Sequence, residues 1–156
     1  MFGKVLMDTE DFRVTWVIKW FYYRSKNIPE TEDTKNFGKW MFFFDKEKKG
    51  KETIELCKKA VKEGVVEVCK HTECLIDKEG TGVCCFYCDK DDMSSHKRIL
   101  KFFLDNNLIP LTKDLKLYNI SFKLNEETRN KVYGSNIERP IKLENFVNLY
   151  TYEWLV

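Results

Sequence analysis

The chain has 156 residues, of which 43% are hydrophobic and 15% aromatic, so it can form one domain with a substantial core. Its 27 Lys and Arg against 25 Asp and Glu leave a net charge of +2, which argues against a protein that binds duplex DNA by neutralising many phosphates. No run approaches the ~20 apolar residues that span a bilayer, and the N-terminus lacks the apolar centre of a signal peptide. We expect a single cytoplasmic domain over residues 1–156, with no membrane partner.

Six cysteines are present, and most of them lie in apolar segments of a chain that is large enough to fold without disulfides. Cys85 and Cys88 have the Cys-x-x-Cys spacing of zinc ligands, with Cys69, His71 and Cys74 upstream. Cys85 and Cys88 lie within an apolar run typical of a strand, which lacks the turn that a zinc knuckle requires. We therefore expect buried, reduced thiols, no metal site and no cofactor.

Residues 9–24 begin with Thr9-Glu10-Asp11 and are then apolar or aromatic at almost every position. This pattern allows a helix that begins near Asp11, or an irregular segment that ends in a short strand. Residues 25–36 contain Pro29 and many polar side chains, which predicts a polar loop long enough to border a site.

Residues 39–45 have the pattern of a buried strand, and residues 46–50 that of a charged turn. A helix is predicted over residues 51–63, because apolar residues recur every three or four positions and Gly64 can end it. The segments 65–72 and 83–88 are predicted as strands that pair antiparallel across the turn at residues 77–82.

The next helix is predicted to extend to about Asn106, with Asp91 or Asp92 as its N-cap. Capping explains the cluster Asp89–Asp92 better than a divalent ion does. Residues 118–124 are predicted as a fourth strand and residues 126–129 as a short helical turn. The C-terminal segment 141–156 has apolar residues at helical spacing, and we expect it to pack on the domain with a loosely attached end. These elements together predict an α+β fold.

Several short motifs occur in a recognisable order along the chain. They are Tyr23-Arg24, Gly38-Lys39-Trp40, Val68-Cys69-Lys70-His71-Thr72, Cys88-Asp89-Lys90-Asp91-Asp92 and the segment from Phe122-Lys123 through Arg129 to Tyr133-Gly134. This order resembles that of the basophilic-leukaemia-expressed-protein family, whose fold is similar to that of the cap-binding translation initiation factor. The resemblance implies a single curved, mainly antiparallel sheet that is backed by helices.

Members of this family are also described as similar to bacterial phosphothreonine lyases, which remove phosphate by β-elimination. That similarity implies that Lys70 abstracts the α-proton and that a histidine protonates the leaving phosphate. The histidine position corresponds to Met41, which has no proton to give. His71 is expected on the strand face opposite Lys70, and His96 lies in the next helix. These departures favour a protein that binds its ligand without cleaving it.

The resemblance brings a set of basic residues and one tyrosine to a single pocket, although each residue separately is better explained as a solvated surface group. The set consists of Arg24, Lys39, Lys70, Lys123, Arg129 and Tyr133. A pocket of this kind suits a phosphorylated ligand, either a nucleotide or a phosphopeptide. Lys70 and Arg129 are expected to contribute most. The aromatics Trp16, Trp20, Trp40 and Tyr118 could stack on a base, with core packing as the alternative.

Three functions follow as hypotheses. The first is a non-catalytic cytoplasmic binding domain with a basic and aromatic pocket. The second is an enzyme of the phosphothreonine lyase type, in which Lys70 is the base. The third is a small inhibitor or adaptor, encoded by a phage or another mobile element, that covers the surface of a partner protein.

Overall fold

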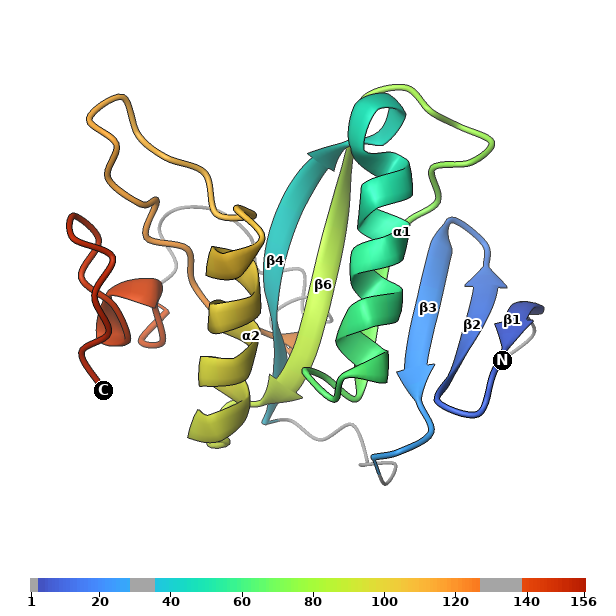
Figure 1. Cartoon of the computed structure of the whole chain (residues 1–156), viewed down its shortest axis with the longest axis horizontal. Coiled ribbons are helices and arrows are strands. Elements are labelled where there is room, and N and C mark those ends of the chain that lie inside the picture. The colour runs from blue at the N-terminus through green and yellow to red at the C-terminus, as the bar shows by residue number, and fades with distance from the viewer. Residues whose placement is uncertain (1–2, 29–35, 127–138) are drawn as a thin grey trace. The chain divides into compact units, whose positions relative to one another are not determined.

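The computed structural model describes residues 3–28, 36–126 and 139–156. Within these residues, two α-helices accompany one open antiparallel sheet, which confirms the α+β class (Figure 1). The order of strands in the sheet is β1-β2-β3-β5-β6-β4-β7. The elements are β1 (Lys4–Asp8), β2 (Phe12–Val17), β3 (Trp20–Ser25), β4 (Phe37–Asp45), α1 (Lys46–Lys62), β5 (Val68–Thr72), β6 (Thr81–Asp89), α2 (Met93–Asp105), β7 (Lys123–Leu124) and the 3₁₀ helix η1 (Leu143–Asn145).

The chain divides into two compact units. The first comprises Met1–Glu32 and Met41–Tyr87, so it holds the N-terminal strands, α1, β5, and most of β6. The second comprises Asp33–Trp40 and Cys88–Val156, so it holds the beginning of β4, α2, β7 and η1. Across the described ranges, no helix combines the length with the apolar character of a membrane span.

Residues 9–24 form no helix, so the first expectation for this stretch is wrong, and the alternative is right only in its final strand, because most of the segment before it is also a strand. β2 and β3 form an antiparallel hairpin in which Val17 pairs with Trp20 across a two-residue turn. Apolar Phe12 and Val14 alternate with polar Arg13 and Thr15, which is the period of a strand with one buried face. β1 extends the hairpin antiparallel to β2, with a bulge between Val5 and Met7.

The first helix begins five residues earlier than expected, because the predicted turn at residues 46–50 is helical. The Asp45 side chain accepts a hydrogen bond from the Lys48 N–H at 2.8 Å and caps the helix. Gly50 is buried inside the helix, where an added Cβ would lie 3.1 Å from the Cys74 sulfur. The C-terminal end matches the prediction, because Gly64 follows the cap residue in the left-handed region with φ of 74°.

β5 and β6 pair antiparallel as predicted, with His71 opposite Cys84. β5 begins at Val68 rather than at residue 65, and β6 extends over Thr81–Asp89. Of the two candidate caps for α2, Asp92 is the N-cap, and its carboxylate accepts hydrogen bonds from the backbone N–H and the hydroxyl of Ser95. The aspartate cluster therefore caps a helix, as the sequence indicated.

The C-terminal part of the chain has less regular structure than predicted. The strand expected over residues 118–124 is reduced to Lys123–Leu124, preceded by an isolated bridge between Ser121 and Lys142. The helical spacing after residue 141 yields only the three-residue helix η1, followed by a bridge between Val147 and Trp154. The end of the chain is attached, because the Leu155 N–H donates to the Phe146 carbonyl at 2.8 Å. The turn predicted at residues 126–129 lies almost wholly outside the described residues.

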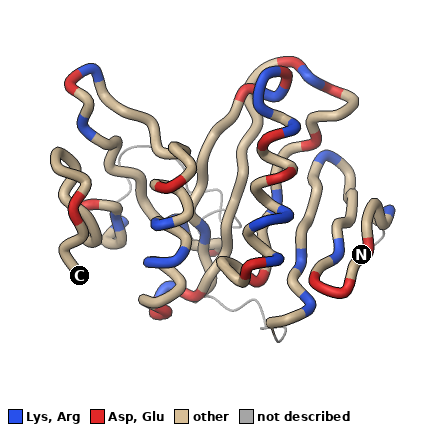
Figure 2. Tube along the Cα trace, viewed as in Figure 1, with Lys and Arg blue, Asp and Glu red and all other residues tan. Residues whose placement is uncertain are grey.

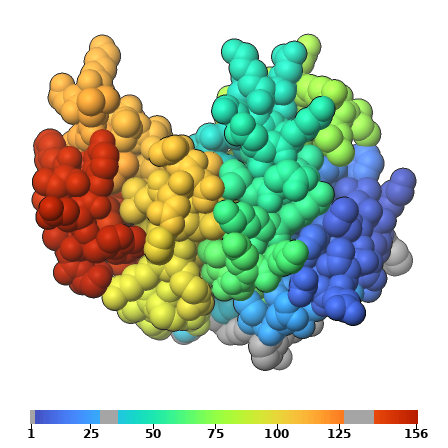
Figure 3. Space-filling view, in the orientation of Figure 1, coloured from blue at the N-terminus to red at the C-terminus, as the bar shows by residue number. Residues whose placement is uncertain are grey.

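The core of the first unit lies between α1 and one face of the strands. α1 packs against β2, β3 and β5, and it buries Cys57, Ala60 and Val61 there. Its outer side carries lysines interspersed with glutamates (Figure 2). In the space-filling view, α1 side chains form the surface of this unit beside the N-terminal strands (Figure 3).

The loop between β5 and β6 is organised by the carboxylate of Glu73. It accepts hydrogen bonds from the backbone N–H groups of Leu75, Ile76 and Asp77. Burial alone raises the pKa of this carboxyl, but the three N–H groups stabilise the carboxylate and bring the pKa below its usual value. Glu73 therefore fixes the loop through charge-assisted hydrogen bonds.

Replacing Glu73 with glutamine should lower the free energy of unfolding at pH 7 by about 1 kcal/mol, because neutral acceptors make weaker hydrogen bonds. The folded-state pKa is depressed, so this stabilisation is present above the unfolded pKa and is lost as pH falls through the folded pKa. Urea denaturation at pH 7 and near pH 3 measures both effects. Glu79→Gln, on an exposed residue of the same loop, is the control and should change little at either pH.

Candidate functional site

One face of the strands in the first unit points away from α1. Cys57 of α1 contacts Cys84 of β6 and is also close to Cys69 of β5, so Cys69, His71 and Cys84 face the helix. Because side chains alternate along a strand, Lys70 and Cys85 point to the opposite face. Their neighbours on this face follow from the register, in which Lys70 pairs with Tyr22, Tyr22 with Thr15, and Arg24 with Arg13. We call this the open face.

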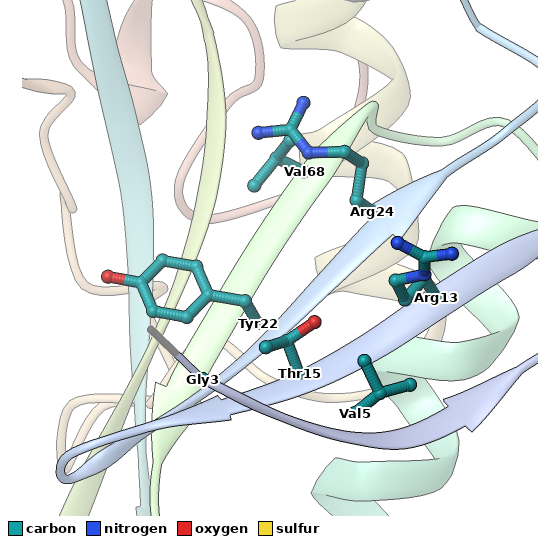
Figure 4. Close-up of a pocket in the computed structure, with 7 residues that line it drawn as sticks. All are labelled: Gly3, Val5, Arg13, Thr15, Tyr22, Arg24 and Val68. Carbon is teal, nitrogen blue, oxygen red and sulfur yellow. The ribbon is translucent and has the colours of Figure 1, made fainter. Parts of the chain in front are cut away.

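A pocket of about 340 Å³ lies on the open face. Its lining residues come from the N-terminal strands and from the start of β5, and they are Gly3, Val5, Arg13, Thr15, Tyr22, Arg24 and Val68 (Figure 4). The two arginines are direct cross-strand partners, and so are Thr15 and Tyr22. One end of the pocket therefore carries two arginines from neighbouring strands, of which Arg24 extends toward Val68, and beside it lies an end with a hydroxyl group and an aromatic ring (Figure 4).

The basic residues at the arginine end form ion pairs with nearby carboxylates. Arg13 donates to the Asp8 carboxylate at 3.0 Å, and Lys26 also bonds to Asp8. These two cations hold the pKa of the Asp8 carboxyl below its usual value. The Arg24 guanidinium lies 3.5 Å from the Glu67 carboxylate, which is a long contact for an ion pair. Both arginine ion pairs are partly exposed, so the guanidinium groups can exchange partners.

Lys70 lies between two aromatic rings of β3. Its ammonium nitrogen is 3.9 Å from the centre of the Trp20 ring and 5.5 Å from that of Tyr22. Both distances suit a cation–π contact, which orients the lysine over the strand surface. Burial and the neighbouring Cys85 raise the pKa of the Tyr22 hydroxyl, so it stays protonated near neutral pH.

The structure brings together some of the residues that the sequence singled out. Arg24 and Lys70 share the open face of the first unit, with Arg24 in the pocket and Lys70 beside Tyr22. Lys39 and Lys123 are cross-strand partners of β4 and β7 in the second unit. Arg129 and Tyr133 lie outside the described residues.

His71 is a buried structural residue. Its Nδ1 atom lies 2.7 Å from the Thr72 carbonyl oxygen and its Nε2 atom lies 2.8 Å from the Tyr23 hydroxyl. A carbonyl can only accept, so Nδ1 carries the proton and Nε2 accepts from the tyrosine. Both ring nitrogens are therefore used inside the core, on the face opposite Lys70 as expected from alternation.

His96 has an equivalent arrangement in the second unit. Its Nδ1 atom accepts a 2.9 Å hydrogen bond from the indole N–H of Trp40, and its Nε2 atom lies 2.8 Å from the Lys90 carbonyl. The indole is only a donor, so the proton of His96 is on Nε2. Trp40 is thus a core residue, whereas Trp20 lies on the open face and Tyr118 is exposed.

Each of the six cysteines is buried, as predicted, and carries a thiol. Within residues 3–28, 36–126 and 139–156, no group of three or more His, Cys, Asp or Glu side chains is arranged to hold a metal ion. The open face itself presents two guanidinium groups, an ammonium group, hydroxyls, aromatic rings and the Cys85 thiol.

Sequence reasoning missed Arg13, Thr15 and Tyr22 as site residues. All three belong to the β2–β3 hairpin, which was not predicted as a hairpin. The alternation in Phe12–Val17, apolar at every second residue, was the available signal. It places Arg13 and Thr15 on one face and therefore beside Arg24 and Tyr22 once the strands pair.

No protein-family model and no curated protein matches this chain.

Proposed function

We propose that this chain is a binding protein whose open face takes a phosphorylated ligand, with the phosphate held by Arg13 and Arg24. The observation that carries the proposal is the cross-strand pair of arginines at one end of a pocket of about 340 Å³. A guanidinium group offers two parallel N–H donors, which match the oxygens of a phosphate. A phosphate can replace Asp8 on Arg13, because that ion pair is partly exposed.

The aromatic end of the pocket favours a nucleotide as the ligand. Tyr22 presents its ring next to the arginines, and Lys70 is stacked between Tyr22 and Trp20. A flat heterocycle can pack on such a surface, since each base has a π-face. The expected resemblance to the cap-binding initiation-factor fold is part of the proposal, and an antiparallel sheet with a helix on one face supports it.

Binding is favoured over β-elimination because neither histidine is available as the acid that the lyase resemblance requires. The chain has two histidines, and each uses both ring nitrogens in hydrogen bonds within a core. Met41 occupies the position that the lyase resemblance assigns to the acid, and its side chain carries no acidic proton. Lys70 therefore serves in the proposal as a cation that attracts the ligand.

Calorimetric titration with a nucleoside monophosphate, its nucleoside and a phosphothreonine peptide tests the proposal. Arg13→Gln and Arg24→Gln should each weaken binding of the nucleotide by about 10- to 100-fold, the usual range for a hydrogen bond to a charged group. Lys59→Gln removes the same charge from an exposed position on α1 and should leave the affinity unchanged. The nucleoside should bind more weakly than the nucleotide.

Two outcomes contradict the proposal. One is equal affinity of wild type, Arg24→Gln and Lys59→Gln for every phosphorylated probe, and the other is the absence of binding by all of them. Tighter binding of the peptide than of the nucleotide assigns the site to phosphopeptides. Mass spectrometry of the recovered peptide checks for β-elimination, because loss of its phosphate would show catalysis.

A further inference from the structure

Three thiols meet in the core of the first unit, away from the open face. Cys57 of α1 and Cys84 of β6 have their sulfur atoms 3.5 Å apart, and the Cys69 sulfur lies 3.9 Å from the Cys57 carbonyl oxygen. None of the three residues is exposed to solvent. The proposed ligand pocket uses none of them.

The Cys57 and Cys84 sulfurs are close enough to form a disulfide bond after a small movement. A disulfide bond is about 2.0 Å long, so a movement of about 1.5 Å between the sulfurs would bring them to bonding distance. The two residues come from different elements, since Cys57 lies within α1 and Cys84 within β6. A bond between them would tie the helix directly to the strand on which it rests.

The surroundings of Cys57 also favour its reaction as the attacking sulfur. Burial alone raises the pKa of the Cys57 thiol, but hydrogen bonds from the Cys69 and Cys84 thiols hold it well below its usual value. Burial, together with the contact to Cys57, raises the pKa of the Cys84 thiol well above its usual value. Either thiol can donate in the 3.5 Å contact, and the opposite directions of the two shifts favour Cys57 as the attacking sulfur.

We propose that Cys57 and Cys84 form a reversible redox pair, which a peroxide converts into a disulfide that joins α1 to β6. The Cys57 sulfur attacks the O–O bond of hydrogen peroxide, which gives a sulfenic acid and one water molecule. The Cys84 sulfur then attacks the sulfenic sulfur, the S–S bond forms, and the second oxygen leaves as water. Two thiols are oxidised and one peroxide is reduced to two waters. A small thiol reverses the reaction by exchange.

Such a bridge would hold the first unit in its folded state under oxidising conditions. It closes a loop between residues that are 27 positions apart, so it restricts the unfolded chain. Hydrogen peroxide is small and uncharged, and local opening of the unit gives it access to the buried thiols. The contact between α1 and β6 would thus respond to an oxidant from within the core of the first unit.

Peptide mapping after treatment with hydrogen peroxide tests the proposal. The full chain is oxidised in its native state, denatured, treated with N-ethylmaleimide to block the remaining thiols, and digested. The expected result is a linked peptide pair containing Cys57 and Cys84, which disappears on treatment with dithiothreitol. The oxidised protein should also unfold at a higher temperature than the reduced protein.

Three variants identify the partners. Cys84→Ser should abolish the bridge and leave a sulfenic acid on Cys57 that dimedone traps, whereas Cys88→Ser, in the second unit, should keep the bridge. Cys69→Ser should keep it too. Failure to find the Cys57–Cys84 peptide in oxidised wild type overturns the proposal, and so does a bridge from Cys57 to Cys69. The peptide map of oxidised wild-type protein decides whether the bridge forms, so the test still works if a variant fails to fold.

Discussion

Replacing Gly38 with alanine should destabilise the second unit by about 3 kcal/mol, the upper end of the usual cost of overpacking a core. An added Cβ would lie 2.5 Å from the Phe122 ring and 2.6 Å from the backbone oxygen of Lys123. The ring can rotate, but the backbone oxygen belongs to β7, which pairs with β4 at Gly38 and Lys39. Relief of the clash therefore requires β7 to move, and the pairing is weakened.

Chemical denaturation of wild type and Gly38→Ala, followed by tryptophan fluorescence, measures this effect. Trp40 is fully buried two residues after Gly38 and reports on the same unit. Phe43→Ala provides the control on the same strand, because Phe43 is 68% exposed and its replacement should change stability by no more than about 0.5 kcal/mol. If Gly38→Ala has the same unfolding midpoint as wild type, the close approach of β7 does not require glycine at position 38.

This result would explain why Gly38-Lys39-Trp40 is informative as a sequence marker. Glycine allows β7 and Phe122 to approach the strand, and Trp40 anchors the strand to His96. Both roles are structural. The strand itself could be predicted because its apolar run and its flanking residues are local signals.

The N-terminal hairpin could not be predicted from its turn. Two-residue turns usually carry Gly or Asn where φ is positive, and here that position is Ile18 with φ of 57°. A β-branched residue is strained there, and the strain is compensated by pairing of the strands and by a 2.7 Å hydrogen bond from the Trp16 indole to the Ile18 carbonyl. These compensating contacts form only when the tertiary structure is present.

In the candidate site, too, some residues could be identified from the sequence and others only from the pairing of the strands. Arg24 and Lys70 were identified from the sequence, and they lie on the open face. Arg13 and Tyr22 become site residues only through the register that places Arg13 opposite Arg24 and Lys70 opposite Tyr22. Composition and periodicity do not determine which strands are neighbours, because strand order depends on packing between distant segments.

The sequence predicted more regular structure near the C-terminus than the chain has, for a related reason. Leu143, Phe146 and Val147 have helical spacing and are buried, as a helix would require. The chain buries them instead through one short 3₁₀ turn and the Val147–Trp154 bridge. Burial of apolar groups can be achieved by several backbone paths, so spacing alone does not specify which path a short segment takes.

The second large effect expected is a fall in stability on mild acidification that depends on His96. Burial lowers the pKa of this histidine, despite the Lys90 carbonyl and nearby aspartates, which favour its charged form. Protonation would place a proton on Nδ1, which already faces the N–H group of Trp40. Between the folded and unfolded pKa values the unfolded chain binds more protons, so stability is full above about pH 6.5 and decreases below it.

The decrease should approach about 1.4 kcal/mol per pH unit below pH 6.5, the limit for one proton. Denaturation curves between pH 7 and pH 5 measure it, and this range lies above the pKa values of Glu73 and Asp92, which are both lowered. In His96→Gln the amide still offers an acceptor and a donor but binds no proton, so the slope assigned to His96 should disappear. Lys97→Gln, on an exposed position of α2, should retain the wild-type slope. An unchanged slope in His96→Gln would mean that another group is responsible, and that the Trp40–His96 hydrogen bond does not limit stability in acid.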